Sequence, residues 1–122
     1  LMSAVGKVIW LKTEDKINDI IAVAGSAPAY FFLFMEAMEK QAQTLGFSAQ
    51  ESRMLVQQTA LGAAQMVEHN TAPISTLREN VTSKGGTTFA ALEQFRADGL
   101  EETVSNAMNA AIARAEAMAK GN

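Results

Sequence analysis

The sequence predicts an all-α protein, a single helical domain of five to six helices. Hydrophobic residues make up 48% of the 122 residues but aromatic residues only 7%, so alanine and methionine supply much of the apolar content. This composition suits close helix packing better than a β-sheet. Apolar residues also recur at helical spacing through most of the chain. The length allows one domain with a core and is too short for two ordinary domains.

The first helix should follow a short apolar segment. The chain starts at Leu1 and reaches a β-like run, Val8-Ile9-Trp10-Leu11, without the pattern of a signal peptide. We expect the chain to be part of a longer protein, with residues 1–11 as the tail of a missing domain or a linker. Thr13 can cap the helix. Apolar residues then follow at helical spacing as far as Gly25, namely Ile17, Ile20, Ile21 and Ala24.

A second helix is expected from Ser26 as N-cap, with Pro28 in the first turn, to about Leu45, with Gly46 as the residue after the cap. Residues 30–35, Tyr-Phe-Phe-Leu-Phe-Met, are apolar on every side of such a helix. The helix must therefore be surrounded. We favour burial by a partner subunit or domain, and the alternative is a central core helix of a monomer.

A third helix is predicted from the capping-box spacing of Ser48 and Glu51 to about His69 and Asn70. Alanines and Gly62 form a face against which another helix could pack closely. His69 is the only histidine. Its place at a helix end favours a cation beside helix carbonyls over a catalytic role, because no carboxylate or thiol is arranged beside it in sequence.

Three shorter predictions complete the chain. Thr71-Ala72-Pro73 should start a short helix that leads into a glycine-containing loop at residues 80–88. A brief helix with Phe89, Leu92 and Phe95 follows and stops at Asp98-Gly99. Asp98 and Glu101 have capping-box spacing for the last helix. Its apolar stripe comprises Leu100, Val104, Met108 or Ala107, Ala111, Ile112, Ala115 and Met118.

The loop at residues 80–88 is the candidate functional site. Two glycines directly before a helix can turn several N–H groups and the positive end of the helix dipole toward one point, where an anion would sit. The hydroxyls of Thr82, Ser83, Thr87 and Thr88 surround these glycines. A plain tight turn between helices is the alternative. The loop is not a Walker A motif, because Lys84 precedes the glycines.

Composition excludes several classes of function. The formal net charge is −3, with 10 basic and 13 acidic residues and no Lys/Arg block, so we expect no nucleic-acid or anionic-membrane partner. No apolar run approaches the roughly 18 residues of a membrane span. Cysteine is absent, which excludes disulfides and thiolate chemistry, and a metal site would have to be built from one histidine. We expect no metal, and the cytoplasm by default.

Two motifs resemble a known family. Ala24-Gly25-Ser26-Ala27-Pro28-Ala29-Tyr30-Phe31 and Leu77-Arg78-Glu79-Asn80-Val81-Thr82-Ser83-Lys84-Gly85-Gly86-Thr87-Thr88 closely resemble the C-terminal half of Δ1-pyrroline-5-carboxylate reductases, over essentially the whole chain. Ala27 stands where that family usually has glycine, and Lys84 where proline is frequent. Neither departure removes a hydroxyl or a paired glycine.

The resemblance implies a 6-phosphogluconate-dehydrogenase-like reductase that converts Δ1-pyrroline-5-carboxylate to L-proline with NADPH or NADH. Residues 1–11 would be the tail of its N-terminal Rossmann domain, and residues 12–122 its dimerisation and substrate-binding domain. The cofactor-binding residues would lie mainly in the absent domain, so this chain alone should bind no cofactor and be inactive. The helices would form an interlocked homodimer, often built into larger oligomers.

By position, the resemblance places the substrate carboxylate on the amides around Gly85, Gly86 and Thr87, with Ser83. It places the ring nitrogen on the hydroxyl of Thr88, which would be the catalytic residue. Two other functions remain open: a non-enzymatic helical interaction module whose glycine loop is only a turn, and the helical domain of another Rossmann-type dehydrogenase.

Overall fold

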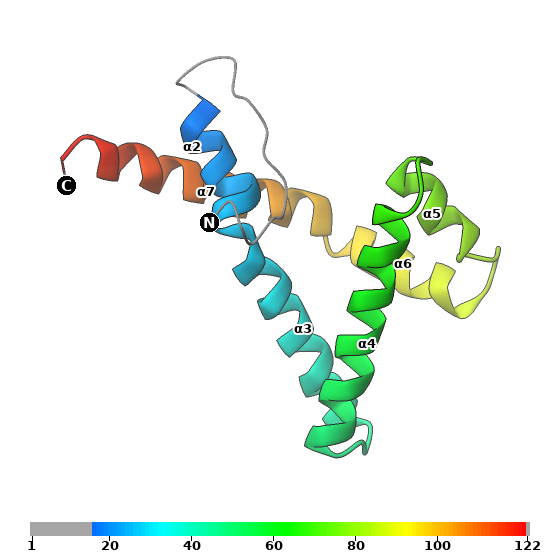
Figure 1. The fold of residues 1–122 in the computed structure, drawn as a ribbon. Helices are drawn as coiled ribbons and strands as arrows, with labels where there is room; N and C mark the ends of the chain where they lie inside the picture. Colours follow the sequence, from blue (N-terminus) through cyan, green and yellow to red (C-terminus); the bar gives the residue numbers. More distant parts are fainter. Residues whose placement is uncertain (1–15, 122) are drawn as a thin grey trace. The chain divides into compact units, whose positions relative to one another are not determined.

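A computed structural model describes residues 16–121, and all regular secondary structure in that range is helical, which confirms the all-α class (Figure 1). The expected apolar run at residues 8–11 and the cap at Thr13 lie outside the described residues. The elements are α2 (Lys16–Ile20), the π-helical turn η1 (Ile21–Gly25), α3 (Ala27–Thr44), α4 (Ala49–Glu68), α5 (Ile74–Asn80), α6 (Thr87–Ala97) and α7 (Leu100–Ala119).

The helix break predicted at Gly25 is instead a wide π turn within a continuous helical path. The N–H of Ser26 donates to the carbonyl of Ile21, five residues earlier, at 2.7 Å. Pro28 has no N–H, and its ring crowds the carbonyl four residues before it, so a widened turn accommodates it. Ser26 has helical dihedrals, φ −91° and ψ −19°. Ser26 directly precedes α3, as predicted, but it lacks the extended dihedrals usual for an N-cap.

The chain divides into two compact units, of which the first contains Leu1–Phe32 and Gly99–Asn122. Among its described residues, α7 contacts both α2 and η1. Ala22 and Ala27 are buried in this unit. Of the predicted stripe of α7, Met108, Ala111, Ile112 and Ala115 are half-buried, whereas Leu100, Val104 and Met118 are exposed. The small side chains of η1 let the helices approach closely.

The second unit, Leu33–Asp98, contains the end of α3 and the helices α4, α5 and α6. As predicted, Gly46 ends α3: its φ is +108°, and its N–H donates to Gln43 O at 3.0 Å. The N–H of Phe47 donates to Ala42 O at 3.2 Å, which completes a Schellman motif. Figure 1 shows α3 and α4 diverging from this turn.

The predicted capping box of α4 is confirmed. The Glu51 N–H donates to Ser48 Oγ at 3.1 Å, and the Ser48 N–H donates to Glu51 Oε1 at 2.9 Å. At the other end, His69 is the C-cap, close to the predicted boundary. The amide of Asn70 donates to Met66 O at 2.7 Å and so satisfies one of the last helical carbonyls.

The capping box predicted at the start of α7 is absent. The N-cap is Gly99, with φ +78°, and makes no side-chain cap hydrogen bond. Asp98 instead ends α6, and its carboxylate accepts a hydrogen bond from Gln94 Nε2 at 3.1 Å. Because the chain reverses through the left-handed conformation of Gly99, the Asp98 side chain belongs to the preceding helix.

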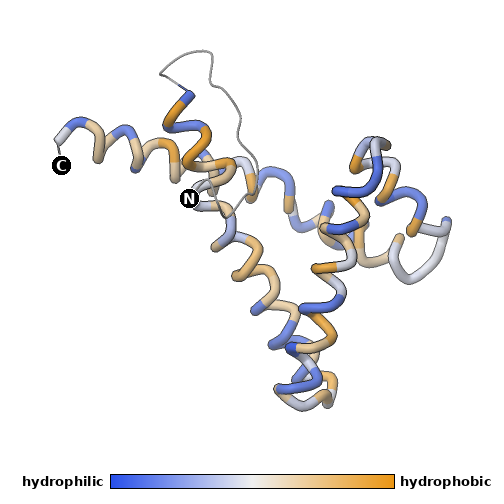
Figure 2. The backbone as a smooth tube through the Cα atoms, viewed as in Figure 1, coloured by the Kyte–Doolittle hydropathy of each residue, from blue (hydrophilic) through white to orange (hydrophobic). Residues whose placement is uncertain are grey.

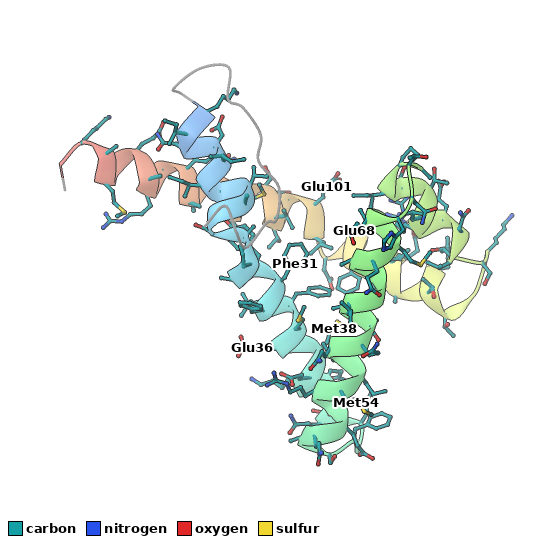
Figure 3. All side chains as sticks on the ribbon, viewed as in Figure 1. Phe31, Glu36, Met38, Met54, Glu68 and Glu101 are labelled. Atoms are coloured by element: carbon teal, nitrogen blue, oxygen red, sulfur yellow. The ribbon has the colours of Figure 1, made fainter. Side chains whose placement is uncertain are left out.

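Large apolar side chains remain uncovered in this single chain. Among residues 16–121 the buried apolar side chains are only Ala22, Ala27 and Val56. Figure 2 shows apolar residues predominating along α3, and Figure 3 labels Phe31, Met38 and Met54, which are 67%, 40% and 60% exposed. Such faces need a further surface to cover them.

One sequence expectation about membranes requires correction. The continuous helix Lys16–Thr44 is long and apolar enough, by length and composition alone, to cross a membrane. The expectation that no run of this kind exists was wrong, because two elements judged as separate helices form one helical path. The core helix of a soluble protein and a signal sequence pass the same test.

Candidate functional site

The candidate site lies where α5 ends and α6 begins, entirely within the second unit. The chain leaves α5 at Val81, whose N–H donates to Arg78 O at 3.3 Å. The hydroxyl of Thr82 donates to the same Arg78 carbonyl at 2.6 Å. The Thr82 side chain therefore caps the end of α5. Its hydroxyl is not a ligand donor, contrary to the prediction from sequence.

Residues 83–86 form a tight turn. The N–H of Gly86 donates to Ser83 O at 3.0 Å, which closes the turn. Gly85, the third residue, has φ +73°, whereas no non-glycine residue in the described range has positive φ. This combination is the signature of a type II turn, in which the third position favours glycine. Space around the Gly85 Cα is open.

Gly86 is required for a different reason, which is the position of Ser83. A Cβ built on Gly86 would lie 2.5 Å from Ser83 Oγ and 3.2 Å from Ser83 O. The backbone of Gly86 itself is ordinary, with φ −86° and ψ −177°. The absence of a side chain at Gly86 thus allows the Ser83 hydroxyl to lie directly beside the N-cap of α6.

The first turn of α6 carries donors without local partners. Gly86 is its N-cap, with no side-chain cap hydrogen bond and no acidic residue in the first turn. The N–H groups of Thr87, Thr88 and Phe89 precede the first intrahelical bond, from the Ala90 N–H to Gly86 O at 3.1 Å. Within residues 16–121 these three amides have no hydrogen-bond acceptor. The positive end of the α6 dipole is therefore open to an external anion.

The start of α6 differs from that of α4, which has a capping box. There the amides of Ser48 and Glu51 each donate to the other residue's side chain, and Glu51 supplies a negative charge. At α6, Thr87 and Thr88 are exposed residues that carry hydroxyls. The site thus offers hydroxyls and amides in one short stretch, an arrangement that suits a small carboxylate.

The predicted site residues therefore lie together on one turn and the start of one helix: Ser83, Gly85, Gly86, Thr87 and Thr88. The amide of Gly86 is already committed to the turn. Contrary to the expectation from sequence, a carboxylate lies beside His69: Glu68 Oε1 is 3.6 Å from its Nε2, on an exposed helix end. No group of three potential metal ligands occurs among the residues that the structure describes.

Comparison with known proteins places the chain in a family. A family model described as pyrroline-5-carboxylate reductase dimerisation matches residues 14–118. The pyrroline-5-carboxylate reductase of Vibrio alginolyticus is 60% identical over 121 residues, which are 98% of this chain and 44% of that protein. The Pasteurella multocida enzyme is 50% identical over 98% of this chain and 44% of its own length. The chain thus spans less than half the length of these relatives.

Solved structures agree with this fold. A pyrroline-5-carboxylate reductase from Coxiella burnetii superposes with a TM-score of 0.89 at 43% identity, over 94% of this chain and 43% of that one. The Plasmodium falciparum pyrroline carboxylate reductase, solved with NADP bound, superposes with a TM-score of 0.85 at 32% identity, over 91% and 42%. On these matches, the chain belongs to the pyrroline-5-carboxylate reductase dimerisation domain family.

Proposed function

We propose that this chain is the dimerisation and substrate-binding part of a reductase that converts Δ1-pyrroline-5-carboxylate to L-proline with NADPH or NADH. The family match supports this activity for the longer protein. The observation that carries the site is the start of α6, where uncapped amides lie beside the Ser83 hydroxyl. In this assignment, substrate contacts come from Ser83, Gly85, Gly86, Thr87 and Thr88.

The substrate carboxylate would bind at the N-terminus of α6. The Thr87 and Thr88 amides lack partners among the described residues, and no acidic side chain competes with an anion in this first turn. A carboxylate here accepts hydrogen bonds and faces the positive end of the helix dipole, so it needs no buried cation. Gly86 contributes the space that keeps the Ser83 hydroxyl nearby.

Thr88 would act at the imine nitrogen. Thr88 is an exposed residue in the first turn of α6, directly after Thr87. During reduction the C=N carbon gains a hydride and the nitrogen gains a proton. A hydroxyl held beside this nitrogen stabilises its protonated form or passes on the proton. Most of the remaining rate would come from positioning the C=N carbon against the hydride donor.

The hydride donor, NADPH or NADH, would bind mainly to residues outside this chain. The Plasmodium falciparum relative is solved with NADP bound, and this chain spans 42% of it. We therefore propose that this chain alone is inactive. Tight NADPH binding or turnover by residues 1–122 alone would contradict this, and calorimetry with NADPH gives a direct readout.

The uncovered apolar face of α3 would be buried against a second copy of the chain. Phe31, Phe32 and Leu33 are 67%, 62% and 69% exposed in one chain. Their burial in a homodimer would provide the cover that residues 30–35 require, and the family is one of dimerisation domains. Larger oligomers of such dimers, and an interlocked arrangement of the helices, belong to the same proposal.

The role of Thr88 is tested by Thr88→Ala and Thr88→Val in the full-length protein. We expect kcat/KM for Δ1-pyrroline-5-carboxylate to fall by about 10- to 1000-fold, because one transition-state hydrogen bond is lost. Valine keeps the bulk of threonine, so it separates loss of the hydroxyl from a packing change. Thr88→Ser keeps the hydroxyl and should retain most of the rate. Unchanged kinetics in the valine variant would remove Thr88 from the mechanism.

A further inference from the structure

We propose that Lys84 strengthens binding of the substrate carboxylate as an unpaired cation on the turn, a role that rests on the proposed function above. Lys84 is the second residue of the turn closed by the Gly86 N–H and Ser83 O, and it is exposed. It makes no ion pair with any residue that the structure describes. Its ammonium is therefore available to attract an anion bound at the start of α6.

The surrounding charges favour this role. Of the basic residues that flank the loop, Arg78 lies 3.9 Å from a carboxylate oxygen of Glu79, and Arg96 lies 2.8 Å from one of Glu93. Residues 80–92 contain no aspartate or glutamate. Lys84 is thus an unneutralised positive charge within residues 80–92. The positive end of the α6 dipole lies in the same stretch, and both attract a carboxylate.

The geometry sets the size of the effect. The ends of a four-residue turn lie within about 7 Å of each other. Lys84 lies between these ends, two residues before the N-cap Gly86, and its flexible four-carbon side chain can bring the ammonium to within about 7 Å of a carboxylate on the first amides of α6. At about 7 Å in a water-like dielectric, a unit-charge attraction changes affinity by about threefold at low salt. Salt removes most of it, because the screening length falls from about 30 Å at 0.01 M to about 3 Å at 1 M.

The test uses the full-length protein with Lys84→Gln, and Lys84→Arg as the matched control that keeps the charge. At about 0.01 M ionic strength, Lys84→Gln should raise KM for Δ1-pyrroline-5-carboxylate about threefold, and at about 1 M the two proteins should converge. Lys84→Arg should match the parent protein at both. The inhibition constant of L-proline should depend on the Lys84 charge and on salt in the same way. The inhibition constant of prolinamide should not, because prolinamide lacks the carboxylate.

Three results would overturn the proposal. One is a KM that does not change in Lys84→Gln, and another is a change of equal size at low and high salt. The third is a change confined to KM for NADPH, which would assign the lysine to the cofactor phosphates. Lys84→Pro separates the effect of charge from that of turn rigidity, because proline suits this turn position. If Lys84→Pro binds the substrate more tightly than Lys84→Gln, the rigidity of the turn affects binding more than the charge of Lys84 does. If the parent protein shows no reductase activity, the proposed function fails instead.

Discussion

At the scale of single residues, the two adjacent glycines of the turn have separate functions. Gly85 is needed for its backbone conformation, since its φ is +73° and the space beside it is open. Gly86 is needed for space, since a Cβ there would lie 2.5 Å from Ser83 Oγ. One glycine therefore permits the turn, and the other permits the position of the hydroxyl beside the helix start.

This difference predicts distinct effects of Gly85→Ala and Gly86→Ala in the full-length protein. Gly85→Ala should lower the free energy of unfolding by about 1 to 2 kcal/mol, because alanine is strained in the left-handed region. Gly85→Asn should recover part of this loss. Gly86→Ala should mainly raise KM for the substrate, because the Ser83 hydroxyl must move away. Chemical denaturation and steady-state kinetics measure the two quantities.

A double-mutant cycle provides the control for Gly86. In a Ser83→Ala background the atom nearest to the new Cβ is gone, and the nearest remaining atoms are Ser83 O at 3.2 Å and Ser83 Cβ at 3.7 Å. Gly86→Ala should then raise KM less than it does in the parent protein. Strictly additive effects of the two substitutions on KM would show that Gly86 does not act through the Ser83 hydroxyl.

At the scale of secondary structure, helix ends differ in how their amides are satisfied. At α4, Ser48 and Glu51 hydrogen-bond in both directions. At α7 the predicted box of Asp98 and Glu101 is replaced by Gly99 in the left-handed conformation. At α6 no side chain caps the helix. The starts of α6 and α7 both lack a side-chain cap, but α7 carries Glu101 and Glu102 in its first turn, whereas α6 has no acidic residue there and so leaves its start open to an anion.

The capping box predicts that Ser48→Ala lowers the free energy of unfolding by about 1 kcal/mol, within a range of about 0.5 to 2. Asp98→Ala is the matched control, since Asp98 has capping-box spacing in sequence but caps no helix start in the structure. We expect its effect to stay within about 0.5 kcal/mol. Equal losses in the two variants, measured by urea denaturation, would contradict these assignments.

At the scale of the whole molecule, the uncovered apolar residues predict a dimer. In light scattering the chain should have twice the 13.0 kDa of one copy. Phe31→Glu should shift the mass toward the monomer, because Phe31 is 67% exposed in one chain and a buried charge there would be unpaired. Gln43→Glu, an exposed position on the same helix, is the control and should stay dimeric. A parent chain that remains a 13.0 kDa monomer would refute the dimer.

Much of the fold could be predicted from sequence because most helix ends depend on adjacent residues. Gly46 and the pair of Ser48 and Glu51 act over three to five positions, so their patterns could be read directly. The π turn before Pro28 was missed because a proline in a helical pattern usually ends the helix. Here the widened turn accommodates the proline ring and the helix continues. Thr82 was wrongly assigned as a ligand donor, because the sequence does not show that its hydroxyl donates to the Arg78 carbonyl.

The sequence by itself determined the all-α class, most helix boundaries and the stretch of Ser83 to Thr88 as the candidate site, because periodicity, caps and paired glycines are local properties. Only the tertiary structure decided that the Ser83 hydroxyl occupies the space of the missing Gly86 side chain. It also decided that the first three amides of α6 lack acceptors among the described residues. Both features depend on the path of the backbone after the turn. A hydrogen-bond donor can bind a ligand only when the folded chain provides no acceptor for it.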